Sequence, residues 1–248
     1  MSALFHTIIF QPLFNGLIIL QQYVTFGDLG LAIIILTVIV RAILYPFSYK
    51  TFRSQMIMQK IQPEVKKIQE KHKDNKEKQA ELLMAIWKKH KVNPFSGFFL
   101  LIIQLPILIA LYRIFLSDFS PATLDNLYPF FTHPEVIKQS FLGLINLREK
   151  SIVIVGIAAI LQYIQGRLSM FHTKTEKNGK PASKMSRNMV FLGPVITIVF
   201  LTALPAAVGI YWATTAAFSI FQQFIIRRSF SASDERDKNN PDYGGKTS

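Results

Sequence analysis

The sequence contains no cysteine, which excludes disulfide bonds, thiolate catalysis and cysteine-ligated metal sites. Acidic side chains are absent from its long apolar stretches, because all fifteen lie in polar loops, in the tail or at the edges of those stretches. Transporters driven by protons or cations rely on carboxylates inside the membrane, so this absence argues against that class. An HExxH zinc motif and a phosphate-binding glycine loop are also missing. We therefore expect a protein that is not an enzyme and needs neither metal nor cofactor.

Basic residues are missing from the first 28 positions and are concentrated elsewhere. Without Lys or Arg there, the charged start of a cleavable signal peptide is missing, so we expect the chain to be used whole. Residues 50–91 hold twelve Lys and Arg against five acids, and residues 167–187 hold six against one. Because cytoplasmic loops carry an excess of positive charge, both segments and the C-terminus are predicted to lie in the cytoplasm, with the N-terminus outside.

Hydrophobic residues make up half of the 248 positions, and they are concentrated in blocks rather than spread at amphipathic spacing. A helix needs about 17–25 mostly apolar residues to cross the hydrocarbon core of a bilayer. Five blocks are long enough or nearly so: residues 29–47, 94–116, 152–170, 189–203 and 206–226. An odd number of spans also satisfies the charge distribution. The sequence thus predicts an all-α polytopic membrane protein with five transmembrane helices.

The N-terminal segment, residues 1–28, is apolar but patterned. Gln11, Asn15 and Gln22 fall on one helical face, and Pro12 interrupts the segment. This pattern predicts an amphipathic helix lying in the outer interface of the membrane. A sixth span is the alternative.

The basic segment, residues 50–91, has apolar residues at helical spacing on both sides of a polar turn at residues 72–76. It is predicted to form a cytoplasmic helical hairpin, with Pro63 in the first turn of a helix. Its basic surface is either simply solvated or a docking site that recruits clients and anionic partners through Lys66, Lys67, Lys71, Lys88 and Lys89. Residues 227–248, rich in polar residues, are predicted to be a disordered cytoplasmic tail.

A single arginine, Arg41, lies inside the first apolar block. A guanidinium stays protonated at any accessible pH, and placing it near the centre of a membrane helix costs roughly 2.5–3.5 kcal/mol. Snorkelling to the headgroups is the simplest explanation, but Arg41 lies nine residues before Lys50, which is about 13 Å along a helix. We therefore interpret Arg41 as lining a polar cavity.

Polar residues also recur at helical spacing within three of the blocks. Such residues often form hydrogen bonds between membrane helices, and for any one block that explanation is favoured. Three polar stripes together with an arginine are better explained by a shared water-filled cavity. The candidate lining from these stripes is Thr37, Arg41, Gln165, Tyr211, Thr215 and Gln222.

Four segments in order along the chain carry a family resemblance. GDLGLAIIILTVIVRAILYPF resembles the first core span, with its single arginine, of the YidC family of membrane protein insertases, the Oxa/Alb-type group. IQPEVKKIQEKHKDNKEKQAELLMAIWKKHKVNPFSG is similar to the family's cytoplasmic hairpin. FFLLIIQLPILIALYRIF resembles its Q-x-P-x-x-x-x-L-Y span, and LPAAVGIYWATTAAFSIFQQFII its last span. We expect a short form of the family, without the large extracytoplasmic domain of some relatives.

The resemblance implies five transmembrane helices around a hydrophilic groove that is open to the cytoplasm and to lipid. Arg41 matches the groove arginine, Gln165 the glutamine of the third span, and Tyr211 and Trp212 an aromatic pair of the last span. It also implies a function in the bacterial plasma membrane. Nascent hydrophobic segments and short acidic outer tails would move through the positively charged groove into the bilayer, without nucleotide hydrolysis.

The clients implied are nascent membrane proteins. The ribosome, the signal recognition machinery and the Sec translocon are candidate partners, and membrane lipids surround the chain. Two other functions stay open at this point. One is a small transporter or anion channel that uses Arg41 as a counter-ion, and the other is a scaffold subunit of a translocon.

Overall fold

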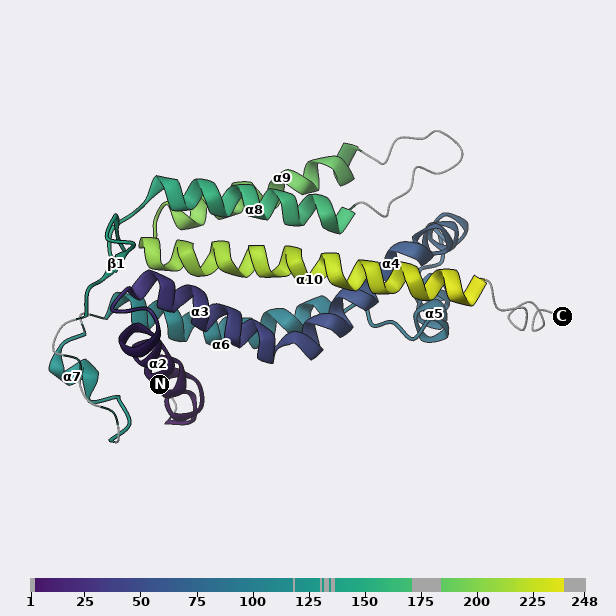
Figure 1. Cartoon of the computed structure of the whole chain (residues 1–248). Coiled ribbons are helices and arrows are strands. Elements are labelled where there is room, and N and C mark those ends of the chain that lie inside the picture. The colour runs from purple at the N-terminus through teal and green to yellow at the C-terminus, as the bar shows by residue number, and fades with distance from the viewer. Residues whose placement is uncertain are drawn as a thin grey trace.

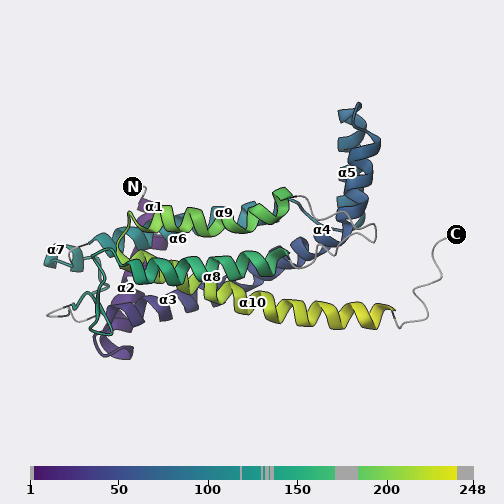
Figure 2. The same cartoon turned by 90° about the horizontal axis from the view of Figure 1, so that it is seen from above.

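The computed structural model describes residues 3–117, 119–129, 131, 134, 137–170 and 184–238, and within these ranges the protein is mostly helical. Long helices lie side by side to form a bundle in both views (Figures 1 and 2). They are α3 (Leu29–Ile43), α6 (Ser96–Leu116), α8 (Ile152–Met170), α9 (Lys184–Leu201) and α10 (Ala206–Lys238). In this bundle α10 packs against α8 and α3, and α8 packs against α9.

Length and composition identify two helices of the described chain that could cross a membrane alone, Ala3–Val24 and Ile152–Ser169. A third candidate arises if α3 and the helix that follows it, α4 (Tyr45–Lys71), count as one bent span. Shorter apolar helices cover Ile102–Leu116 and Val190–Leu201. The structure therefore supports a helical membrane protein with two or three candidate spans.

The N-terminal helix runs across one end of the bundle rather than along it (Figures 1 and 2). Its polar stripe is covered by protein: Asn15 is only 2% exposed and bonds the main chain at Asn126 and Tyr128. Its apolar side places Phe14 and Leu17 in the bundle core. The helix is thus docked onto the fold through both kinds of contact. It comprises α1 (Ala3–Phe5), η1 (His6–Phe10), α2 (Gln11–Ile19) and η2 (Leu20–Val24).

The first apolar block does not form the continuous helix that the sequence suggested. Helix α3 ends at Ile43, and α4 departs from it at 67°. Pro46 lies at the start of α4, where its missing N–H and fixed φ suit a first turn, whereas inside a continuous helix they would kink or break it. Arg41 therefore lies in the last turn of α3, close to a bend.

Helices α4 and α5 (Lys76–Lys89) form a hairpin that projects from the bundle (Figure 2). Asn75 caps α5 by accepting a hydrogen bond from Lys78 N at 2.9 Å. A small apolar core of Ile61, Val65 and Val92 joins the two helices to the following loop. Pro63 lies inside α4 and not in a first turn, so that detail of the sequence prediction was wrong.

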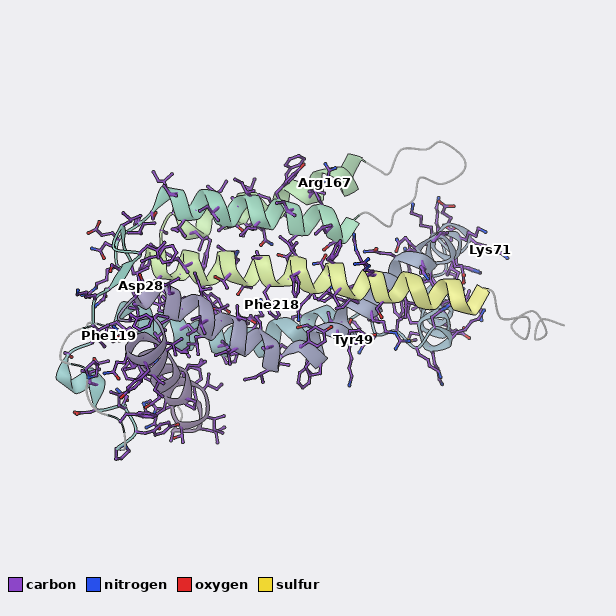
Figure 3. The ribbon with its side chains drawn as sticks, viewed as in Figure 1. Asp28, Tyr49, Lys71, Phe119, Arg167 and Phe218 are labelled. Atoms are coloured by element: carbon purple, nitrogen blue, oxygen red, sulfur yellow. The ribbon has the colours of Figure 1, made fainter. Side chains whose placement is uncertain are left out.

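A short extended segment covers the end of the bundle where α3, α8 and α10 begin. It contains the helix α7 (Pro121–Leu124) and the antiparallel strands β1 (Ser140–Phe141) and β2 (Ile145–Asn146). Asp28 fastens this hairpin to α3, because one carboxylate oxygen caps Leu31 N at 2.8 Å and the other accepts from Leu142 N at 2.5 Å. Figure 3 shows Asp28 at this end of the bundle.

Helix α10 extends to Lys238 and so continues beyond residue 226 into the range assigned to a disordered tail. The sequence boundary was set where apolar residues give way to polar ones, but helix formation does not require an apolar residue at every turn. Residues 239–248, the rest of that predicted tail, lie outside the described residues.

Buried side chains divide the bundle into two halves. Around the starts of α3, α8 and α10 they are mostly apolar, including Phe14, Leu17, Leu29, Ile33, Leu111, Ile114, Leu147, Ile154, Leu201 and Val208. Farther along α3 and α10, and on α4 after the bend, the buried side chains include many polar ones: Thr37, Arg41, Ser48, Thr51, Ser219, Gln222 and Gln223. We call these regions the apolar half and the polar half.

Candidate functional site: a buried arginine in the polar half

The centre of the candidate site is the guanidinium of Arg41, which is only 7% exposed. Its place in the last turn of α3 is favourable, because the carbonyl end of a helix carries partial negative charge. Among the described residues no ion pair of Arg41 with a carboxylate is found. A buried cation compensated only by dipoles attracts anions strongly, since the effective dielectric constant is lower than in water.

Tyr211 of α10 lies near Arg41 of α3. The two groups are close enough to interact electrostatically, and the Tyr211 hydroxyl also accepts a hydrogen bond from the Gln104 amide of α6. Tyr211 is 3% exposed, so this contact is shielded from the surface. Three helices, α3, α6 and α10, thus each contribute one polar group to the same place.

Several buried polar atoms of this region have no hydrogen-bonding partner among the described residues. They are Gln104 Oε1 and both Nε2 and Oε1 of Gln222. Leaving a buried polar group unpaired costs about 1–3 kcal/mol, so native proteins keep such groups where water or a ligand pairs with them. The region is therefore suited to hold water or polar groups of a transient ligand.

The predicted lining residues are only partly brought together. Thr37 lies one helical turn before Arg41 and is 2% exposed, but its hydroxyl donates to its own helix at Ile33 O (2.6 Å). Trp212 turns toward α9, where its ring packs on Phe200 with centroids 5.8 Å apart. Gln165 is half-buried on α8, and no interaction with Arg41 places it in the cluster.

Two glutamines belong to the polar half although the predicted lining omitted them. Gln104 bonds Tyr211, and Gln223 is 6% exposed with its Nε2 unpaired. The signal for Gln104 was present in the Q-x-P motif of its span, two residues before Pro106. Gln223 directly follows Gln222, and neighbouring residues of a helix point in different directions. Helical periodicity therefore assigned only Gln222 to the cavity.

The hairpin lysines lie far from this cluster. Lys66, Lys67, Lys71, Lys88 and Lys89 are all exposed on the surface of α4 and α5. Figure 3 shows Lys71 at the hairpin, beyond the end of the bundle. Their position leaves the basic surface accessible to large partners. Among the described residues no group of His, Cys, Asp and Glu is arranged to hold a metal ion.

Comparison with known proteins identifies the fold. The sequence model of the 60Kd inner membrane protein family matches residues 19–234. A membrane protein insertase YidC of Francisella philomiragia is 31% identical over 210 residues, which are 85% of this chain and 34% of the relative. The YidC of Francisella tularensis subsp. novicida is 30% identical over the same shares. The chain thus spans about a third of the length of these relatives.

A solved structure supports the same assignment at the level of the fold. A crystal structure of an active YidC insertase, with its first transmembrane domain resolved, superposes with a TM-score of 0.59 at 24% identity. The match covers 85% of this chain and 44% of that one. Since the family match covers most of the sequence, this chain belongs to the YidC family of membrane protein insertases, the Oxa/Alb-type group, an inner membrane protein family.

Proposed function

We propose that this chain is a membrane protein insertase and folding chaperone. It moves nascent hydrophobic segments and their short acidic outer tails into the bilayer through a groove in the polar half, without nucleotide hydrolysis. The observation that carries the proposal is Arg41, a cation 7% exposed in a helical bundle and without a carboxylate partner among the described residues. An incoming acidic tail supplies the missing negative charge.

The difference between the apolar half and the polar half supports entry of the client tail from the side of the polar half. In the apolar half, the main chain at Leu147 and Glu149 accepts hydrogen bonds from Ala207 N (3.1 Å) and Ala206 N (2.7 Å), which ties the start of α10 to the covering segment. Phe14 and Leu111, 0% and 1% exposed, fill the space below it. A closed apolar end keeps ions from leaking, while the polar half shortens the distance that a tail crosses dehydrated.

In this proposal the five apolar blocks are five transmembrane helices, with the N-terminus outside and the C-terminus in the cytoplasm of a bacterial cell. The bent pair α3–α4 provides the first span and then leaves the membrane as the hairpin. The exposed lysines of the hairpin recruit clients or anionic partners such as the ribosome, the signal recognition machinery or the Sec translocon. Thr37, Gln165, Trp212, Thr215 and Gln222 are proposed to contact the client along the groove.

The test uses the purified chain in sealed liposomes and a single-span client with a short acidic outer tail. Protection of the tail from added protease is measured for the wild type, Arg41→Lys and Arg41→Glu, after each is shown to be folded. Unit charges 4 Å apart at an effective dielectric constant of 20 interact by about 4 kcal/mol, so we expect Arg41→Glu to lose more than about tenfold in yield. Arg41→Lys keeps the charge and most of the activity.

Two controls make the result specific to Arg41. Arg113→Ala removes an exposed arginine of α6 and is expected to leave the yield unchanged. A client with a neutral tail is expected to depend much less on the charge at position 41. Equal protection by the wild type, Arg41→Lys and Arg41→Glu would remove the electrostatic mechanism.

The same liposomes separate the two other functions. A transporter or anion channel would show anion flux that scales with the charge at position 41 and would leave the client unprotected. A scaffold subunit would show neither flux nor protection, and Arg41→Ala would alter only its stability or assembly.

A further inference from the structure

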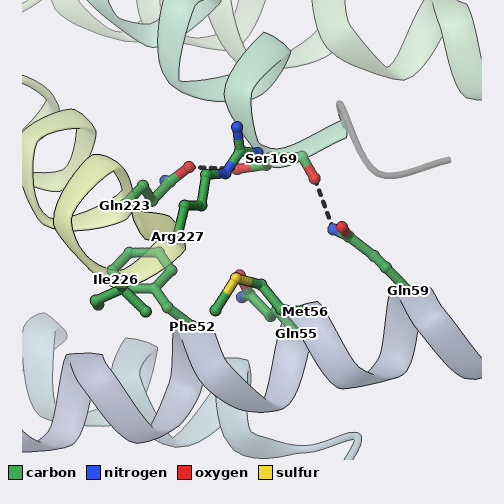
Figure 4. Close-up of a pocket in the computed structure, with 8 residues that line it drawn as sticks. All are labelled: Phe52, Gln55, Met56, Gln59, Ser169, Gln223, Ile226 and Arg227. Atoms are coloured by element: carbon green, nitrogen blue, oxygen red, sulfur yellow. Dashed lines mark hydrogen bonds between the residues drawn. The ribbon is translucent and has the colours of Figure 1, made fainter. Parts of the chain in front are cut away.

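A second site lies between α4, α8 and α10, at the end of the bundle near the hairpin (Figure 4). Its cavity holds about 20 Å³, enough for about one water molecule or one ligand oxygen. Phe52, Gln55, Met56, Gln59, Ser169, Gln223, Ile226 and Arg227 line it. Arg41 is not among these residues, so the cavity is distinct from the Arg41 cluster, although Gln223 of the polar half belongs to its lining.

The polar groups of this cavity are poised to donate hydrogen bonds. Ser169 O accepts from Gln59 Nε2 at 2.6 Å, and Gln223 Oε1 lies 3.4 Å from Ser169 Oγ, whose hydroxyl also donates to Gln165 O at 3.0 Å. Gln223 is 6% exposed, and its Nε2 is buried with no partner among the described residues. The half-buried Arg227 adds a guanidinium, and no carboxylate is among the lining residues. The unpaired amide of Gln223 favours a ligand that accepts hydrogen bonds, and the guanidinium of Arg227 favours an anion.

The surroundings favour a ligand that is both anionic and apolar. Phe52, Met56 and Ile226 form the apolar part of the lining beside Arg227. Arg227 directly follows the last apolar block, residues 206–226, which places it at the level of the headgroups. Basic pockets between membrane helices on the cytoplasmic side bind anionic lipid headgroups. A free phosphate offers the same oxygen atoms but makes no use of the apolar wall.

We propose that this cavity binds the phosphate of an anionic phospholipid, with Arg227 and Gln223 as its donors. One phosphate oxygen enters the cavity, and the rest of the headgroup stays outside, because the enclosed space holds a single oxygen. Arg227 forms charge-assisted hydrogen bonds with the phosphate, the strong kind in which both groups are ionised. The acyl chains then follow the apolar surface toward the bilayer. The lipid joins α4, α8 and α10 at the base of the hairpin.

The neighbouring Arg228 provides a matched control, because it is exposed and carries the same charge on the same helix. The full chain in detergent is titrated with short-chain phosphatidylglycerol, and bound lipid is counted by native mass spectrometry. We expect Arg227→Gln to weaken binding by about tenfold or more, as the loss of a hydrogen bond to a charged group does. Arg228→Gln is expected to change it less than about twofold, as for an exposed charge.

A second variant covers the case in which Arg227→Gln fails to fold. Gln223→Leu removes the unpaired donor and a buried polar group, so it is expected to fold and yet to bind the lipid about threefold or more weakly. Phosphatidylcholine, whose phosphate is balanced by a choline, is expected to bind much more weakly. Equal losses for Arg227→Gln and Arg228→Gln, or unchanged binding in Gln223→Leu, would overturn the proposal.

Inorganic phosphate distinguishes the source of the anion. If the site is built for a lipid, a large excess of inorganic phosphate leaves bound phosphatidylglycerol in place. Full displacement of the lipid by inorganic phosphate at equal concentration would show that the cavity takes a free anion, and would overturn the assignment to a lipid.

Discussion

The apolar and polar halves of the bundle are built from the same helices but differ in how their buried groups are satisfied. On α10, the buried residues Ala206, Ala207 and Val208 are apolar, whereas Ser219, Gln222 and Gln223 farther along are polar. The change comes at Tyr211, where the Arg41 cluster begins. In the proposed function the first half excludes water and the second admits it. Arg41 lies at this boundary, which is why the proposed groove is centred on it.

Close contact holds the apolar half together. Lipid tails are as apolar as the side chains, so helices in a membrane associate through van der Waals packing and small residues rather than through a hydrophobic driving force. Gly209 of α10 fits this rule, because a Cβ added there would lie 2.6 Å from Ile154 Cγ2 of α8. Gly30 of α3 is similarly covered by the ring of Phe141. These contacts leave no room for a solute.

The largest effect is expected from filling the Gly209 contact. Gly209→Val forces α8 and α10 apart, since Ile154 is β-branched and has one strongly preferred χ1 in a helix. Overpacking of this kind lowers the free energy of unfolding by about 1–3 kcal/mol. We expect a loss near the upper end of this range, because Val adds two methyl groups beyond the Cβ. The thermal midpoint of the purified protein measures the loss. Gly156→Val is the control, because a Cβ added at Gly156 meets nothing within 4 Å. Equal midpoints would mean that the apolar half is not tightly packed.

In the polar half, an apolar substitution of a buried residue is expected to raise the thermal midpoint, whereas Gly209→Val lowers it. Gln222 is 1% exposed and neither of its amide atoms has a hydrogen-bonding partner among the described residues. Replacing an unpaired buried group by an apolar one of similar size removes a cost of about 1–3 kcal/mol, so Gln222→Leu is expected to raise the thermal midpoint. The same variant is expected to insert clients less well, as stability gained at a functional site often lowers activity. A lower midpoint would mean that Gln222 is paired, with water or protein, in the resting state.

The smallest effect concerns the cover of the apolar half. Asp28→Ala removes the cap of α3 and the acceptor for Leu142 N. Loss of a helix cap costs about 1 kcal/mol, and the hairpin of β1 and β2 loses its attachment. Hydrogen exchange at residues 140–146 that is faster in Asp28→Ala than in the wild type, with a smaller change at α3, would show this local opening. Asp125→Ala, at an exposed position of the segment that covers the apolar half, serves as the control. Unchanged exchange in Asp28→Ala would show that the hairpin is held by other contacts, such as Phe141 on Gly30.

Much of this organisation could be predicted from one sequence, because membrane helices are marked by long apolar blocks and Arg41 is a rare residue within one. The bend after Arg41 could not be placed in this way. Pro46 is compatible both with a kinked span and with the start of a new helix, and only the packing of α3 and α4 decides between them.

The lining of the site was harder to predict than its centre. Helical spacing puts Thr37, Trp212 and Gln165 near polar neighbours but does not give the rotation of each helix in the bundle. Trp212 instead packs on Phe200, and Thr37 bonds its own helix. The docking of the N-terminal helix onto the bundle could not be predicted for a related reason, since the main-chain segment that Asn15 contacts lies more than 100 residues away in the sequence.

The central claim is that water reaches the polar half from the cytoplasmic side and does not reach the apolar half. The absence of native cysteine allows single thiols to be tested without background. Thr215→Cys and Ala207→Cys place one thiol in each half of α10, in sealed vesicles treated on either side with a maleimide that cannot cross membranes. The account predicts that Thr215→Cys is modified from the cytoplasmic side alone and that Ala207→Cys is unreactive from both sides. Modification of Ala207→Cys from outside, or equal reaction of the two thiols, would contradict it.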